Sequence, residues 1–301
     1  ALDLQAMTRL LVNLREAGQK VYPVATDLFE ELADADAQAS ARLWEDEGGR
    51  LVGFSYVSQY QNLVNAFLAS EFNPTVEKEM MGWAEAAMAD RNLAKGEFNT
   101  LDASTEESDH ERVALLERNG FLRQEESSIL MSRSLEDPIP EPVLPPGFLI
   151  RPMAGEIEIE AYVQLWRTAF GTEQMTVDYR RTIMSAPDYC PELDLVVVAP
   201  GGELAAFCVC QVFPDDGARA EGSREGWTDP VGTHPAYQRL GLALALMFAG
   251  MRLLKARGID TALMGTSSKN VAMRRTAEKA GFRFVSNTLW YSKEVPPLAG
   301  G

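Results

Sequence analysis

The chain contains few cysteines and few histidines, and its charge is strongly acidic. Its 301 residues include three cysteines and two histidines, with a formal net charge of −16. Three cysteines are too few for a disulfide framework, and no metal-ligand spacing is present, so we expect no metal site. Cys208 and Cys210 are expected to pack in a core, on one face of a strand. The acidic charge argues against a nucleic-acid partner and favours an amine substrate, because phosphate backbones are bound by basic surfaces.

Long apolar runs are also missing. No segment approaches the roughly 20 apolar residues that span a bilayer. The first residues lack the basic stretch and apolar core of a secretory signal. We therefore expect no membrane partner and a cytoplasmic location. Apolar residues make up 46% of the chain and charged residues 24%, which is ordinary for folded globular proteins. The length suits two domains of ordinary size, each with its own core.

The most informative segment runs from Val231 to Ala243, with the sequence V-G-T-H-P-A-Y-Q-R-L-G-L-A. It predicts a strand, a tight turn and then a helix over residues 240–257, where apolar residues recur with helical spacing. The first turn of a helix has unpaired backbone N–H groups and the positive end of the helix dipole, so it can bind a phosphate. Gly241 has no Cβ, which lets the phosphate approach the backbone closely.

Residues Gln238–Ala243 resemble the Q/R-x-x-G-x-G/A signature of the GCN5-related N-acetyltransferases, the GNAT superfamily. Downstream, residues 260–266 predict a strand, and Asn270 opens a helix ending in Gly281-Phe282, similar to the family's N-x-x-A-x-x-L-Y-E-x-x-G-F pattern. The resemblance implies an acetyltransferase with acetyl-CoA as co-substrate. It also implies an α+β fold, in which a mixed, mostly antiparallel sheet splays in the middle and is flanked by helices.

The resemblance also implies where acetyl-CoA would bind. Backbone amides of the turn would bind the pyrophosphate, and the pantetheine arm would pair like an extra strand with residues 231–233. The expected cofactor-binding residues are Val231, Gly232, Thr233, Gln238, Arg239, Leu240, Gly241, Leu242, Ala243 and Asn270.

A proline-rich stretch at residues 137–147 predicts a linker, because proline neither continues a helix nor pairs in a central strand. We expect one domain at residues 1–136 and a second, catalytic domain at residues 148–301. The two halves resemble each other, which indicates two domains of one fold. Tandem domains of this kind are similar to those of the mycothiol synthase-like acetyltransferases.

The repeat has a nearly constant offset. Asn73 precedes His234 by the same 161 residues that separate Gly120 from Gly281 (234 − 73 = 281 − 120 = 161). In that register Glu77–Gly82 takes the place of the phosphate turn, with two carboxylates facing the pyrophosphate and Met80 in the place of the glycine. Both features disfavour the cofactor. We expect a degenerate first domain that serves as packing partner, substrate wall or dimer surface.

Acetyl transfer to an amine needs a route for one proton onto the departing thiolate and one proton off the amine. The family's tyrosine in the L-Y-E pattern often supplies the first, but Ala277 stands at that position. Tyr291 in the last predicted strand is one substitute. Asp229 and Glu225 precede the phosphate turn, where the family often keeps a carboxylate base. The candidate catalytic residues are therefore Tyr291 and Asp229.

Three functions remain open from the sequence. The first is an N-acetyltransferase that acts on a primary amine of a small molecule or an amino terminus, by direct attack in a ternary complex. The second is a non-catalytic acyl-CoA-binding regulatory protein, and the third is a mycothiol synthase-like acetyltransferase. A homodimer is compatible with each. Aromatic residues of the second half are available as walls for the acceptor: Trp166, Phe170, Tyr179 and Tyr189.

Overall fold

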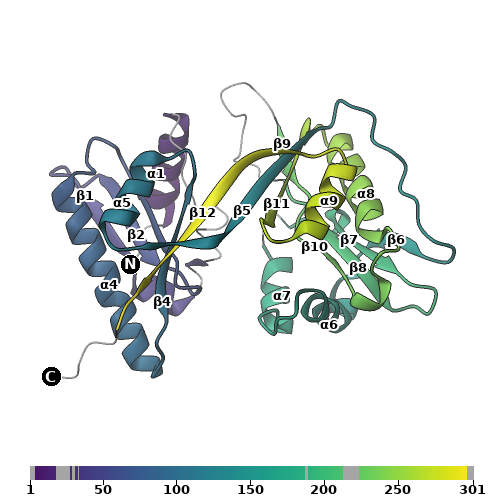
Figure 1. Ribbon diagram of the computed structural model, residues 1–301, viewed down its shortest axis with the longest axis horizontal. Helices are drawn as coiled ribbons and strands as arrows, with labels where there is room; N and C mark the ends of the chain where they lie inside the picture. Colours follow the sequence, from purple (N-terminus) through teal and green to yellow (C-terminus); the bar gives the residue numbers. More distant parts are fainter. Residues whose placement is uncertain are drawn as a thin grey trace. The chain divides into compact units, whose positions relative to one another are not determined.

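The computed structural model describes residues 4–17, 28, 31–32, 34–186, 189–212 and 224–296. The chain divides into two compact units (Figure 1), the first formed by residues 1–127 and 287–301 and the second by residues 128–286. Both units combine sheets with helices, as the sequence predicted. None of the helices in the described part of the chain is long and apolar enough to cross a membrane.

The first unit is built on an antiparallel sheet of three strands in the order β1-β2-β3. Its helices pack their apolar faces on this sheet and on β4, because both surfaces would otherwise expose apolar side chains to water. The elements are α1 (Leu4–Glu16), α3 (Ala35–Ala39), β1 (Arg42–Glu45), β2 (Leu51–Val57), β3 (Leu63–Phe67), α4 (Pro74–Lys95), β4 (Thr100–Glu106) and α5 (His110–Arg118).

The second unit contains an antiparallel sheet of four strands in the order β10-β8-β7-β6. Short 3-10 helices at Gly155–Glu158, Pro191–Leu193 and Pro235–Tyr237 connect its elements. The elements are β6 (Leu149–Pro152), α6 (Ile159–Phe170), α7 (Val177–Met184), β7 (Asp194–Val198), β8 (Leu204–Val209), β9 (Glu225–Trp227), β10 (Val231–Thr233), α8 (Leu242–Ala256), β11 (Thr261–Ser267) and α9 (Val271–Lys279).

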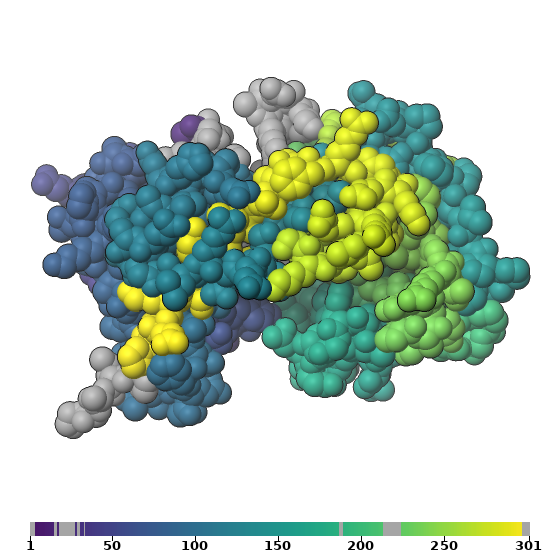
Figure 2. All heavy atoms as spheres, viewed as in Figure 1, coloured from purple at the N-terminus to yellow at the C-terminus, as the bar shows by residue number. Residues whose placement is uncertain are grey.

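Two long strands carry the chain from one unit to the other. Strand β5 (Leu122–Ser134) begins in the first unit, and its residues 128–134 pair antiparallel with β11 in the second. Strand β12 (Arg283–Glu294) begins in the second unit, and its residues 288–294 pair antiparallel with β4 in the first. The yellow atoms at the end of the chain therefore lie among the blue atoms of the first unit (Figure 2).

Because these two strands pass between the units, the units differ from the two domains predicted from the sequence, which were separated by a linker at residues 137–147. The proline-rich stretch has no helix or strand, in keeping with its composition, but it belongs to the second unit. The end of the chain belongs to the first unit, because β12 supplies backbone hydrogen bonds to β4 and core side chains such as Leu289.

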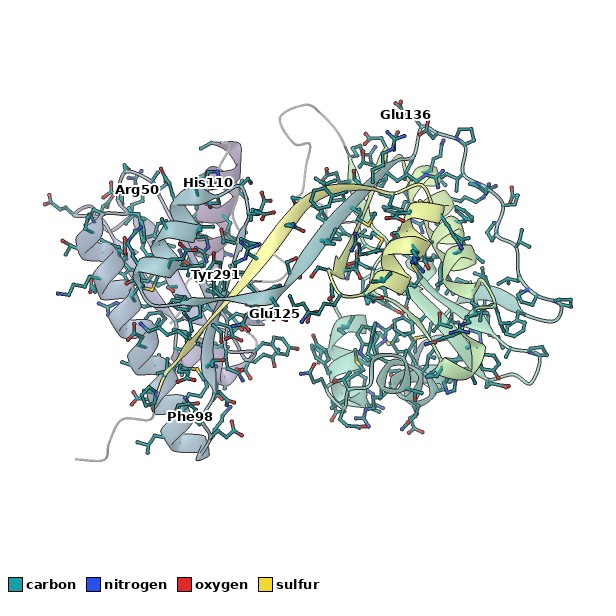
Figure 3. The ribbon with its side chains drawn as sticks, viewed as in Figure 1. Arg50, Phe98, His110, Glu125, Glu136 and Tyr291 are labelled. Atoms are coloured by element: carbon teal, nitrogen blue, oxygen red, sulfur yellow. The ribbon has the colours of Figure 1, made fainter. Side chains whose placement is uncertain are left out.

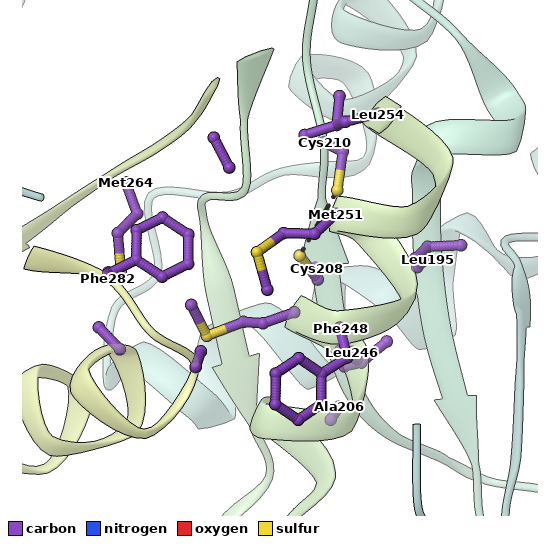
Figure 4. Close-up of a cluster of buried hydrophobic side chains, with 14 of the residues drawn as sticks. Leu195, Ala206, Cys208, Cys210, Leu246, Phe248, Met251, Leu254, Met264 and Phe282 are labelled. Atoms are coloured by element: carbon purple, nitrogen blue, oxygen red, sulfur yellow. Dashed lines mark hydrogen bonds between the residues drawn. The ribbon is translucent and has the colours of Figure 1, made fainter. Parts of the chain in front are cut away.

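Each unit has its own buried core. The largest core cluster of the second unit joins α8 and α9 to the strands beneath them (Figure 4). Cys208 and Cys210 lie in this cluster with their sulfur atoms 3.8 Å apart, which confirms that they pack in the core. Gly250 of α8 packs directly against Cys210, and this close approach brings α8 down onto β8.

Candidate functional site

The chain between residues 225 and 233 divides its hydrogen bonds between two neighbours. Strand β9 pairs in parallel with β11, ending at Trp227 opposite Leu263. The N–H of Thr228 still donates to the carbonyl of Leu263, at 2.9 Å. Strand β10 instead pairs antiparallel with β8, and it belongs to a different sheet from β11. The sheet therefore splays after Thr228, as the sequence predicted.

The splay leaves one edge of β10 open for pairing. The carbonyl of Pro230 accepts from Val209, and the N–H of His234 donates to Ala205, so these residues bond to β8. Backbone groups alternate in direction along an antiparallel strand. Val231 and Thr233 therefore direct their N–H and C=O groups to the opposite edge, toward the splay. An extended ligand can pair with that edge.

Asp229 lies at the point of divergence. Its Oδ2 accepts a hydrogen bond from the backbone N–H of Gly265 in β11, at 3.0 Å. Its Oδ1 is buried and has no hydrogen-bond partner among the described residues. Burial raises the pKa of the carboxyl to about 7, although the bond from Gly265 acts in the opposite direction. A carboxyl that titrates near neutral pH is suited to accept a proton from an amine.

The turn after β10 ends in an exposed helix start. His234 begins it by accepting a hydrogen bond at Nδ1 from the N–H of Ala236, at 3.2 Å. Arg239 and Gly241 both have left-handed backbone conformations, with φ of 65° and 80°. Helix α8 then begins at Leu242 with no side-chain cap. A Cβ added at Gly241 would meet nothing within 4 Å, so the space in front of the helix is open.

These features fit an anion. The first backbone bond of α8 runs from the N–H of Ala245 to the carbonyl of Gly241, so the N–H groups of residues 242–244 come before it. Uncapped N–H groups and the helix dipole attract a phosphate. The pyrophosphate of acetyl-CoA matches both the charge of this turn and its position at the end of the open edge of β10.

The corresponding helix of the first unit is closed by its own side chains. Asn73 accepts hydrogen bonds from the N–H groups of Thr75 and Val76 at the start of α4. Glu77 occupies the first turn and accepts a hydrogen bond from Arg118 at 2.8 Å, which together with Asn119 lowers the pKa of its carboxyl. The positive end of this helix is therefore already satisfied.

The register of the repeat holds here, since the corresponding strands β4 and β11 and the corresponding helices α5 and α9 differ by the same 161 residues, but the aligned segment has a different structure in the first unit. Helix α4 begins at Pro74, so Glu77–Gly82 forms part of the helix and not the turn before it. Met80 is a fully buried core residue and blocks no phosphate turn. The two helices end 161 residues apart, at Lys95 and Ala256 (256 − 95 = 161), so the seven extra residues of α4 (22 − 15 = 7) lie at its start, where Asn73 and Pro74 are the cap and first-turn residues typical of a helix start.

Gly232 of β10 is held between a strand and a helix. A Cβ at this residue would overlap the ring of Phe207 in β8 and crowd Ala169 in α6. On α6, the ring of Trp166 stacks on Phe207 with centroids 4.9 Å apart, and the ring of Phe170 lies 5.7 Å from it. Trp166 and Phe170, two of the four aromatic residues available as walls for the acceptor, thus belong to the helix that packs against β10.

Asn270 precedes α9, which contains Ala277 and packs against α8. The side-chain oxygen of Asn270 accepts a hydrogen bond from the N–H of Met273, at 3.0 Å, so it caps the helix. Ala277 is fully buried in the core cluster of the second unit. The position at which the family often has a tyrosine is therefore closed by packing.

Tyr291 lies in the part of β12 that belongs to the first unit, opposite Ala103 of β4 (Figure 3). Its side chain is 1% exposed, and its hydroxyl lies 3.3 Å from Glu117 Oε1. Its ring packs in the core of the first unit, whereas Asp229 and the phosphate turn belong to the second. The expectation that Tyr291 acts in the second domain conflicts with this placement, because β12 completes the sheet of the first unit.

Comparison with known proteins identifies the family of one segment of the chain. Residues 159–282 match the acetyltransferase (GNAT) family. This segment is a GNAT domain. The predictions of the family and of an acetyltransferase enzyme are confirmed, and the segment contains every candidate of the second unit, from Asp229 to Asn270.

Curated relatives include mycothiol acetyltransferases. The protein of Catenulispora acidiphila is 26% identical over 95% of this chain and 94% of its own length. The protein of Saccharomonospora viridis is 28% identical over 62% of each chain, so this match spans less than two thirds of that relative. The activity in these names belongs to the relatives, and the matches show that this chain is similar to them.

Solved structures show the same fold over nearly the whole chain. A GCN5-related N-acetyltransferase from Sphaerobacter thermophilus has a TM-score of 0.73 and 20% identity, covering 98% of this chain and 93% of its own. A tandem GNAT protein from the clavulanic acid biosynthesis pathway has a TM-score of 0.73 and 15% identity, covering 99% and 97%. The tandem GNAT-like fold predicted from the repeat is confirmed.

Replacement of Tyr291 separates packing from chemistry. Tyr291→Ala removes a buried aromatic ring and should lower the free energy of unfolding by about 3–5 kcal/mol, whereas Tyr291→Phe keeps the ring and should cost much less. Urea unfolding measures both. Tyr291→Phe should also keep the acetyltransferase activity of the wild type, and a large loss in this stable variant would restore Tyr291 as a catalytic residue.

The raised pKa of Asp229 predicts a pH dependence of stability. The folded protein retains the proton on this carboxyl up to about pH 7, while the unfolded chain releases it near the ordinary aspartate pKa of 3.8. The contribution of this carboxyl to the free energy of unfolding is complete below its pKa in the unfolded chain, and it is lost as the pH rises through its pKa of about 7 in the folded protein. The stability of Asp229→Asn relative to wild type should therefore increase between about pH 4 and pH 8. Thermal unfolding at each pH measures the difference, and a constant difference would contradict the assignment.

Proposed function

We propose that this protein transfers the acetyl group of acetyl-CoA to a primary amine, on a small molecule or an amino terminus, by direct attack in a ternary complex. The observation that carries the proposal is the open edge of β10 leading into the uncapped start of α8. In this arrangement, a strand edge for an extended arm is followed at once by a site for its phosphates.

The cofactor residues divide into two groups. The open edge formed by Val231 and Thr233 pairs with the pantetheine arm, while Gly232 keeps β10 close to Phe207. The turn from Gln238 to Ala243 presents its backbone N–H groups to the pyrophosphate. Arg239 belongs to the same turn and neutralises the charge of the phosphates. Asn270 caps the start of α9.

The chemistry requires few groups. A backbone N–H on the open edge of β10 polarises the thioester carbonyl, which stabilises the negative charge that develops on its oxygen. The amine nitrogen forms a bond to the carbonyl carbon, and the bond from that carbon to sulfur breaks. Asp229 accepts the proton that the amine loses, directly or through water. The departing thiolate takes a proton from solvent, since Ala277 supplies none.

A matched pair of glycine variants tests the cofactor site. Gly241→Glu places a carboxylate where the pyrophosphate binds and should weaken acetyl-CoA binding at least tenfold, the effect of about 1.4 kcal/mol of repulsion. Gly82→Glu adds the same charge in α4 of the first unit, where a Cβ also meets open space, and should leave binding unchanged. Equilibrium fluorescence titration measures both affinities. Equal affinities would contradict the proposed site.

The loss of the family's tyrosine favours a second function, that of a regulatory acyl-CoA-binding protein. Measurement of turnover distinguishes an enzyme from such a protein. Release of free CoA thiol is measured with a panel of primary amines that includes the amine precursor of mycothiol, because curated relatives carry that name. We expect amine-dependent thiol release with at least one acceptor. Tight binding without turnover across the panel would favour the regulatory protein.

The role of Asp229 is tested by the pH profile of kcat/KM. With an acceptor from the panel, the wild type should gain activity as the pH rises through about 7, where the carboxyl loses its proton. Asp229→Asn should lose roughly 10²–10⁴-fold in rate, together with this inflection. An unchanged profile in the folded variant would exclude Asp229 as the base.

A further inference from the structure

Three polar side chains are packed together in the interior of the second unit. Tyr162 comes from α6, Arg180 from α7, and Asp194 from the start of β7. All three are almost completely buried. Polar groups at this depth are normally hydrogen-bonded, because burial without a partner costs free energy.

The three side chains contact one another directly. Arg180 forms an ion pair with Asp194 through Nη2 and Oδ2. The guanidinium carbon of Arg180 lies 4.0 Å from the centre of the Tyr162 ring. Tyr189 donates its hydroxyl proton to the same Oδ2 at 2.7 Å, and Arg180 also contacts the sulfur of Met153 at 3.3 Å.

One polar atom remains unpaired on each of the three side chains. Among the described residues, the Tyr162 hydroxyl, Arg180 Nε and Asp194 Oδ1 have no hydrogen-bond partner. Leaving such a group buried and unpaired costs about 1–3 kcal/mol, and more when it is charged. Three such atoms in one contact cluster therefore call for a ligand that pairs with them. They comprise an N–H donor, a carboxylate acceptor and a hydroxyl that can do either.

We propose that these three atoms bind one internal water molecule that positions α6 against β10. The water accepts from Arg180 Nε, donates to Asp194 Oδ1 and completes its bonding with the Tyr162 hydroxyl. Buried waters typically make about three hydrogen bonds, which is the number of unpaired atoms here. The charges of Arg180 and Asp194 cancel, so a neutral ligand suits the site better than an ion.

The functional consequence follows from the other contacts of α6. Trp166 and Ala169, on this same helix, pack against Phe207 and Gly232, which fix β10. The water thus joins α6 to α7 and β7 and holds the helix that supports the strand proposed to bind the thioester. Tyr162 is a positioning residue for acetyl transfer, and this step rests on the proposed function.

A crystal structure of the intact protein tests the water itself. We expect one ordered water within hydrogen-bond distance of all three atoms. Direct pairing of the three atoms with one another or with other side chains would overturn the proposal. The crystal structure does not depend on enzymatic activity. The absence of the water can therefore be distinguished from a failure of the proposed function.

Two tyrosine variants test the positioning role. Tyr162→Phe removes the hydroxyl but keeps the ring that stacks on Arg180, whereas the control Tyr189→Phe removes a hydroxyl that bonds only the other carboxylate oxygen. Tyr162→Phe should lose the water and increase the hydrogen exchange of α6 amides. It should also lower kcat roughly tenfold, the effect of about 1.4 kcal/mol, with the Kd for acetyl-CoA unchanged.

Tyr189→Phe should keep the water and the slow exchange of the α6 amides, and these two measurements are the ones for which it is a control. If Tyr162→Phe lost the water with exchange and kcat unchanged, or if both variants increased the exchange of α6 equally, the positioning role would be overturned. If neither the wild type nor the variants acetylated any amine, exchange of the α6 amides alone would decide whether the water holds this helix.

Discussion

The splay between β10 and β11 is the constraint on which the proposed site depends. After Thr228 the chain stops pairing with β11 and pairs with β8, so one edge of β10 has no backbone partner in the described part of the chain. The same divergence places the carboxyl of Asp229 at the branch point, bonded to Gly265. The turn that follows leads into α8 without a cap. One break in a sheet thus provides a strand edge, a buried carboxyl and an uncapped helix start in sequence.

The two units use one fold differently because of how their central helices begin. In the first unit Asn73 and Glu77 satisfy the start of α4 with a side-chain cap and a carboxylate, so this end of the helix has no need of an external anion. In the second unit the left-handed turn at Arg239 and Gly241 leaves the start of α8 open. The lack of cofactor binding proposed for the first unit therefore rests on capping, and not on Met80, which is a core residue.

Much of the fold, and the turn and helix start of the candidate cofactor site, could be predicted because the signals are local. Gly241, the helix after it and the Asn270 cap lie within a few residues of the structure they specify. Long-range features were not predictable. Tyr291 was assigned to the wrong unit because strand order depends on distant partners such as β4. The helical state of residues 77–82 was missed although Asn73 and Pro74 signal a helix start, whereas the Arg180–Asp194 pair joins residues that no motif connects.

The measurement that tests the central claim most directly is the stoichiometry of acetyl-CoA binding to the intact chain, determined by isothermal titration calorimetry. The account predicts one site per chain, because within the described ranges only the second unit has an open strand edge that leads into an uncapped helix. Two sites per chain would show that capping by Asn73 and Glu77 does not exclude the cofactor. No binding at all would contradict the assignment of the splay and the α8 turn as an acetyl-CoA site.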